Sequence, residues 1–230
     1  MPADQVLVIR LRVVRREFRA VNQNGEDVTS ELRAFAEVIG LERVAAGRYS
    51  IALLLGLFGG FKSGMQNPAK IIREIGALEG LGAPSRTKTA QAFTGFRLRG
   101  LIHKHYLSDG LKSLAVNMKN ELDRSGIPLL KQKVADAEAS GEERYFTVED
   151  AKWIAYEASH GSMLRRMQRN ALTGEWLIYA MHEGRNYYLC LGRHDGNDGE
   201  LRTQIDAICC QEFPFLKELL SADGGGSEIL

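Results

Sequence analysis

Two histidines separated by one lysine are the residues of this sequence best suited to chemistry. They are His103 and His105, in the stretch GLIHKHYLSDG. In a strand the two side chains share one face, whereas in a helix they point about 200° apart. An unperturbed imidazole has a pKa of about 6.5, which suits general acid–base work at neutral pH. The alternative is that one histidine is structural and hydrogen-bonded while the other is solvated.

A metal site at the same histidines is not expected. A His-x-His pair on a strand can bind a metal ion, but no Cys, Asp or Glu nearby in the sequence completes a third ligand. The sequence therefore predicts no metal and no cofactor.

The histidines lie inside a stretch that carries positive charge only. Between Glu79 and Asp109 there is no acidic residue, and the interval contains five basic ones: Arg86, Lys88, Arg97, Arg99 and Lys104. Aromatic residues lie close by in the sequence, namely Phe93, Phe96 and Tyr106 within the stretch and Phe61 upstream of it. Cations neutralise phosphates and rings stack on bases, so the pattern favours nucleic acid as the partner, RNA before DNA. A chain with 30 basic residues can also contain such a stretch by chance, with Phe93 and Phe96 in the core.

A late segment supplies a second polar group. The run EWLIYAMHEGRNYYLCLGRH predicts an antiparallel hairpin, in which Glu175 to His182 pairs with Asn186 to Arg193. If the protein cleaves RNA without metal, His103 or His105 would supply acid–base catalysis, and Arg185 or Arg193 would stabilise the charged intermediate. The order of helices, late hairpin and terminal helix is similar in layout to small toxin ribonucleases. Hairpin tips are also polar simply because they face water.

Composition restricts the class of protein. The 230 residues have 44% hydrophobic content and a formal net charge of +1, which is ordinary for a globular protein and excludes a wholly basic nucleic-acid binder. Three cysteines, two of them adjacent, do not make a disulfide framework, and no secretory leader is recognisable, so we expect a cytoplasmic location. The longest apolar stretch, Ile51 to Phe61, is about half the length that spans a bilayer, so no membrane partner is expected.

The same apolar stretch superficially resembles a phosphate-binding loop. A P-loop has the pattern G-x-x-x-x-G-K-[ST], but counting from Gly56 places Phe61 where the second glycine must be. A phenylalanine there blocks the close approach of phosphate. We therefore interpret residues 51 to 61 as a buried core segment.

The elements that must position these residues give an α+β fold, helix-rich, with a small antiparallel sheet that includes the late hairpin. Strands are expected at residues 6–14 and 49–55. Helices are expected over residues 31–46, 69–80, 111–126, 148–161, 162–173 and 200–210. Residues 1–82 form an N-terminal region, and residues 83–220, which contain the basic stretch and hairpin, follow as a second region or as part of the same domain. The tail, residues 221–230, is expected to be disordered.

Three functions remain open from the sequence. The leading interpretation is nucleic-acid binding through the surface around residues 86–106, and the first alternative is a metal-independent ribonuclease. A protein–protein interaction module is the third, because Trp153, Tyr156, Met163 and Met167 form a stripe that suits a partner as well as a core. Whether the protein is an enzyme is not decided by its sequence.

Overall fold

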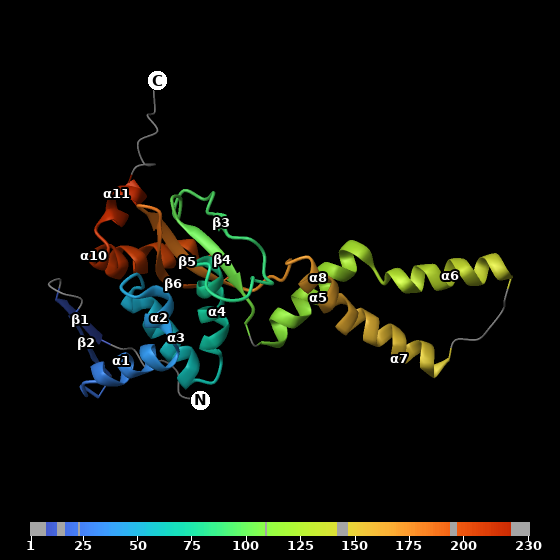
Figure 1. Ribbon diagram of the computed structural model, residues 1–230, viewed down its shortest axis with the longest axis horizontal. Coiled ribbons are helices and arrows are strands. Elements are labelled where there is room, and N and C mark those ends of the chain that lie inside the picture. Colours follow the sequence, from blue (N-terminus) through green and yellow to red (C-terminus); the bar gives the residue numbers. More distant parts are fainter. Residues whose placement is uncertain are drawn as a thin grey trace, which may run out of the picture.

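The computed structural model shows a body that contains the sheets and a helical arm that projects from it (Figure 1). It describes residues 8–12, 17–22, 24–108, 110–141, 147–193 and 197–221. The tail expected to be disordered, residues 221–230, lies outside the described residues except for Ser221, which is the last residue of a helix. The fold class is the predicted one, α+β and helix-rich with an antiparallel sheet.

The main sheet has four antiparallel strands in the order β3-β4-β5-β6. They are β3 (Gln91–Ala92), β4 (Ile102–Tyr106), β5 (Glu175–His182) and β6 (Arg185–Gly192). Strands β5 and β6 are the predicted hairpin, so that prediction is confirmed. Glu183 and Gly184 connect them, and both have positive φ, 49° and 72°, as a two-residue type I′ turn requires.

Both faces of this sheet are covered. Leu177 and Tyr179 of β5 join one buried apolar cluster, whereas Ile178 and Ala180, which alternate with them, join another on the opposite face. The hairpin is therefore an inner ribbon, as its bulky residues on both faces predict.

The first helices cover the face that includes Leu177. They are α1 (Thr29–Val38), α2 (Leu41–Ala45), α3 (Ile51–Lys62) and α4 (Pro68–Leu78). Their cluster contains Leu32 and Ile75 together with Leu177 and Tyr188, so residues from both sides of position 82 share one core. A small separate hairpin, β1 (Val8–Arg12) and β2 (Glu17–Val21), precedes them.

Two sequence-based expectations for this region are wrong. Residues 49–55 are not a strand: Ser50 accepts a hydrogen bond from the Leu53 amide and starts α3, whose apolar residues are buried on several sides. The interpretation of residues 51–61 as a buried core segment holds as far as Phe58, whereas Phe61 is 54% exposed. The helix expected over 31–46 is two helices, because Gly40 takes a φ of 78° between them.

The other face of the sheet is covered by the C-terminal helices. These are α9 (Asp198–Gln204), the π-helical turn η2 (Ile205–Cys209), α10 (Cys210–Glu212) and α11 (Phe215–Ser221). All three cysteines are buried and reduced in this region. Burial raises the pKa of Cys190 to about 12, so its thiol stays protonated at neutral pH.

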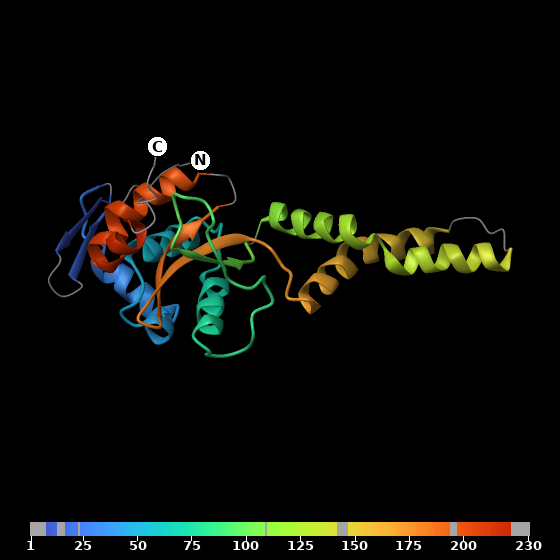
Figure 2. The same ribbon diagram turned by 90° about the horizontal axis from the view of Figure 1, so that it is seen from above.

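The arm is inserted between β4 and β5. It consists of α5 (Leu111–Ser125), α6 (Pro128–Ser140), α7 (Val148–Tyr156), the π-helical turn η1 (Glu157–Gly161) and α8 (Ser162–Gln168). Helix α5 leaves the body, α6 continues outward, and α7 and α8 return (Figures 1 and 2). Helix α7 begins with a capping box formed by Thr147 and Asp150.

Candidate nucleic-acid interface

The basic stretch forms the outer edge of the main sheet. The Lys88 amide donates to the Leu172 carbonyl at 3.0 Å, Gln91 pairs with His103, and the Phe93 amide donates to the Leu101 carbonyl at 3.0 Å. The chain therefore runs along β4 from residue 87 to residue 93 and then turns back to it. Leu98, fully buried, anchors this turn in the core.

The charged side chains exposed along this edge are all basic. Arg86, Lys88, Arg97 and Arg99 are all exposed. Phe96 is 76% exposed, and the Arg97 guanidinium lies 5.3 Å from the centre of its ring. We call these five residues the basic edge. Of the other aromatic residues considered from the sequence, Phe93 and Tyr106 are buried, and Phe61, although half-exposed, lies on α3.

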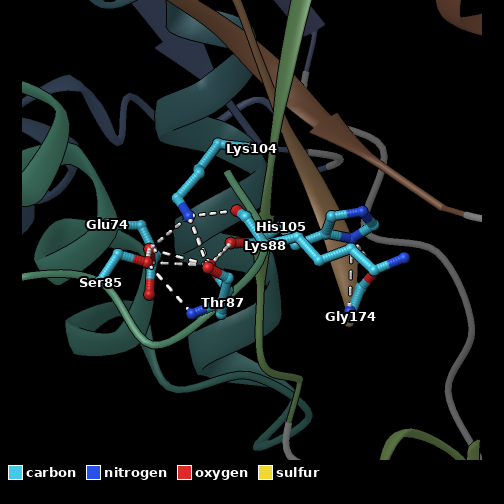
Figure 3. A network of polar contacts seen from close by, with 7 residues as sticks. All are labelled: Glu74, Ser85, Thr87, Lys88, Lys104, His105 and Gly174. Atoms are coloured by element: carbon cyan, nitrogen blue, oxygen red, sulfur yellow. Dashed lines mark hydrogen bonds and ion pairs between the residues drawn. The ribbon is translucent and has the colours of Figure 1, made fainter. Parts of the chain in front are cut away.

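Lys104 does not belong to this surface, which corrects the expectation from the sequence. It is only 3% exposed, and its ammonium nitrogen lies 3.5 Å from a carboxylate oxygen of Glu74 on α4. The ammonium also donates to Thr87, 2.7 Å to Oγ1 and 3.3 Å to the carbonyl oxygen, and to the Lys88 carbonyl (Figure 3). Burial lowers the pKa of Lys104, and the charge of Glu74 opposes that shift. A phosphate cannot reach an ammonium enclosed in this way.

The buried network around Lys104 instead holds the basic edge in place. Ser85 donates to the Glu74 carboxylate, and the Thr87 hydroxyl, whose oxygen lies 3.2 Å from the same carboxylate, donates to the His105 carbonyl at 2.7 Å. Residues 85 to 88 are thereby tied to α4 and to β4 at once. Since the buried polar groups are linked to one another, removing one of them leaves others without partners.

His103 and His105 lie on the opposite face of β4 from Lys104 (Figure 3 shows Lys104 and His105). The two rings are on one face of a strand, as the strand alternative required, with their centres 5.5 Å apart. His103 is packed between Phe93 and Trp176, at 4.7 and 5.1 Å between ring centres. His105 is buried, and its Nδ1 lies 2.9 Å from the Gly174 carbonyl oxygen.

The arginines considered for RNA cleavage are not brought to the histidines. Arg185 pairs with His182 at the hairpin tip, four residues along β5 from Ile178, the partner of His103. At about 3.3 Å per residue the separation along the strand is about 13 Å. Arg193 follows Gly192, which pairs with Trp176, the partner of His105, but it acts on Tyr106, whose side chain lies on the opposite face of β4 from the histidines. The four residues therefore form no common catalytic group.

A second buried network was not anticipated from the sequence. The carboxylate of Glu79 accepts from Arg48 at 3.0 and 2.6 Å, from Asn186 at 3.1 Å and from the Tyr188 hydroxyl at 2.6 Å. It joins the end of α4 to the hairpin and to the link before α3. Partners this far apart in the chain leave no local pattern by which the sequence could reveal them.

Neither a metal centre nor a membrane span emerges in the part of the chain that the structure describes. No three His, Cys, Asp or Glu residues in those ranges are grouped so that they could hold a metal ion. None of the helices described there is both long and apolar enough to cross a bilayer. Comparison with protein-family models, curated proteins and solved structures finds no match to this chain.

Proposed function

We propose that the protein binds single-stranded RNA along the basic edge. The observation that supports this is the exposure of four cations and one aromatic ring on a single sheet edge, in a stretch of chain without acidic residues. Cations on such an edge neutralise phosphates, whichever bases the RNA carries. The proposal therefore concerns binding with little sequence preference.

Phe96 is the reason for preferring a single strand. An exposed ring beside an arginine offers a stacking face to an unpaired base, and bases within a duplex cannot use it. Proteins recognise RNA largely through such unpaired bases, so we propose RNA as the ligand in preference to duplex DNA. The anchoring of Leu98 and the Lys104 network keep this edge ordered before the ligand arrives, which lowers the entropy cost of binding.

The test is a fluorescence anisotropy titration of labelled RNA of about ten nucleotides, repeated between about 50 and 200 mM salt. The double variant Arg97→Gln/Arg99→Gln removes two cations, so the slope of log affinity against log salt should fall by about 1.4. Phe96→Ala should weaken binding about five- to hundredfold with little change in the slope, because it removes stacking and no charge.

The matched control is Arg33→Gln/Arg43→Gln, which removes two exposed arginines from α1 and α2, away from β3 in both views of the molecule (Figures 1 and 2). It should change affinity and slope much less than the edge variant. Equal losses in the two double variants would reduce the interaction to general charge attraction and refute a defined site. Tighter binding of duplex RNA than of the single strand would refute the stacking role of Phe96.

A further inference from the structure

Helix α6 lies at the outer end of the arm with little support from its own chain. All 13 of its residues are described, and none is buried. Its N-cap residue, Ile127, makes no side-chain capping bond, and isolated helices of this length are marginal in water. Toward α7, the Lys133 ammonium lies 5.1 Å from the centre of the Trp153 ring.

An apolar stripe on α6 is covered only in part by its own chain: Val134 is exposed, and Leu130 and Ala137 are half-buried. Leu130, Val134 and Ala137 recur at i, i+4 and i+7, the spacing that places them on one face. Val134 is 49% exposed, and Leu129 beside the stripe is 48% exposed. A helix that needs tertiary support and presents such a stripe requires a second surface to pack against.

The charges along the stripe show what that surface is. In the run KQKVADAE, Lys131 and Lys133 come first and Asp136 and Glu138 follow. Lys131 and Glu138, seven residues apart, border the same flank of the stripe, and Lys133 and Asp136 border the other. The helix is therefore basic toward the body and acidic toward the tip on both flanks.

This pattern is complementary to itself when the helix is reversed. If two copies of α6 pack antiparallel, Lys131 of each lies level with Glu138 of the other, and Lys133 lies level with Asp136. In this register Val134 of each helix packs against Val134 of the other across a two-fold axis near the helix centre, and Ala137 of each lies between Leu130 and Val134 of the other. A parallel arrangement would set lysine beside lysine at the same level.

We propose that α6 is a dimerisation helix whose partner is the α6 helix of a second copy of this chain, packed antiparallel. The arm makes this arrangement possible, because it holds α6 away from the body and leaves the two bodies at opposite ends of the dimer (Figure 1). Since one helix pair buries a small area, we expect a dissociation constant in the micromolar range. The inference does not depend on RNA binding.

Sedimentation equilibrium of the full chain tests the proposal by charge exchange. The unmodified protein should approach twice its 25.6 kDa mass at high concentration. Lys131→Glu alone or Glu138→Lys alone places like charges opposite each other at both symmetric contacts and should raise the dimer dissociation constant about tenfold or more. The double variant Lys131→Glu/Glu138→Lys restores opposite charges across the axis, so its dissociation constant should return to within about threefold of the original.

The control is Lys112→Glu, an equal charge reversal on the exposed surface of α5 near the body, which should leave the dimer unchanged. Circular dichroism of each variant separates loss of the dimer from loss of folding. A protein that stays monomeric at high concentration overturns the proposal, and so does a folded double variant as dissociated as the single ones. Recovery in the double variant supports the proposal. In a complex with a different protein, positions 131 and 138 would not face each other, so neither change would compensate for the other.

Discussion

The body and the arm bury opposite kinds of side chain. In the body, fully buried residues such as Leu54, Leu177 and Tyr188 form continuous apolar clusters. In the arm, α5 turns Ser113, Asn117 and Glu121 inward, and α8 turns Ser162 and Arg166 inward. Between residues 110 and 171, within the ranges that the structure describes, no hydrophobic side chain is buried.

The contact that holds the arm together is electrostatic. The Glu121 carboxylate accepts from both outer nitrogens of Arg169, and Nε of Arg165 lies 3.6 Å from it. Asn117 accepts from Arg166 at 3.0 Å and donates to the Thr173 carbonyl at 2.7 Å, which links α5 to the chain that returns to β5. Leu111, at the start of α5, lies outside this contact and is 79% exposed.

This difference teaches that amphipathic spacing identifies a face but not what covers that face. In the body the apolar face of each helix packs on the sheet. In the arm some apolar residues, such as Leu111 and Val134, are exposed and others, such as Met118 and Trp153, are only half-buried, so the arm alone does not fully cover its apolar faces.

The largest expected contrast comes from the same substitution made in the two regions. Leu177→Ala should lower the free energy of unfolding by about 2–5 kcal/mol, because it leaves a cavity at the centre of the sheet. Leu111→Ala should change it by no more than about 0.5 kcal/mol, because the side chain is already in water. Urea unfolding with unchanged m-values provides the measurement. A comparable loss at Leu111 would mean that the outer face of α5 is covered in solution.

A smaller effect is expected when the polar contact of the arm is broken. Glu121→Gln keeps the shape of the side chain but leaves Arg165 and Arg169 without their carboxylate. Both guanidinium groups remain partly open to water, so we expect a loss of about 1–2 kcal/mol confined to the arm. Amide hydrogen exchange should then accelerate about five- to thirtyfold in α5 and α8 and remain unchanged in β5.

Asp123→Asn is the control for this variant, because it removes an exposed carboxylate from the same helix. Its ion pair with Lys119 is a surface pair between residues i and i+4, worth no more than about 0.5 kcal/mol. If both variants accelerate exchange equally, the buried position of Glu121 has no special role. If β5 also exchanges faster, the arm and the body unfold as one unit.

The sequence predicted the fold best where the local sequence pattern and the burial of the residues in the folded protein indicate the same element. The hairpin was predictable because alternating bulky residues around Glu183-Gly184 carry both the strand signal and the turn signal. Residues 49–55 were assigned to the wrong class because a short apolar run does not distinguish a buried strand from a buried helix. The deciding feature was the Ser50 cap, which is a single hydrogen bond.

The candidate site was predicted only in part, for a related reason. The absence of acids identified the basic stretch, and four of its five cations are exposed. Lys104 is the exception because strand alternation turns it toward α4, where Glu74 neutralises it. A count of charges along a sequence contains neither the strand register nor the distant carboxylate.

The smallest expected effect concerns pH and the network around Glu79 in the body. Burial alone would raise the pKa of Glu79, but hydrogen bonds from Arg48, Tyr188 and Asn186 outweigh it and hold the pKa below the ordinary value of 4.5. A carboxyl whose pKa is lowered on folding stabilises the folded state above its unfolded pKa, and this stabilisation is lost as the pH falls through the folded value.

The free energy of unfolding should therefore be insensitive to this group near neutral pH and should decrease below about pH 4.5. Glu79→Gln should flatten that decrease in urea unfolding measured from pH 6 to pH 3, about the range in which a carboxyl titrates. The arm variant Glu121→Gln should leave the acid dependence of β5 exchange unaltered, whereas a slope in β5 that follows Glu121 would show that the two regions share their stability after all.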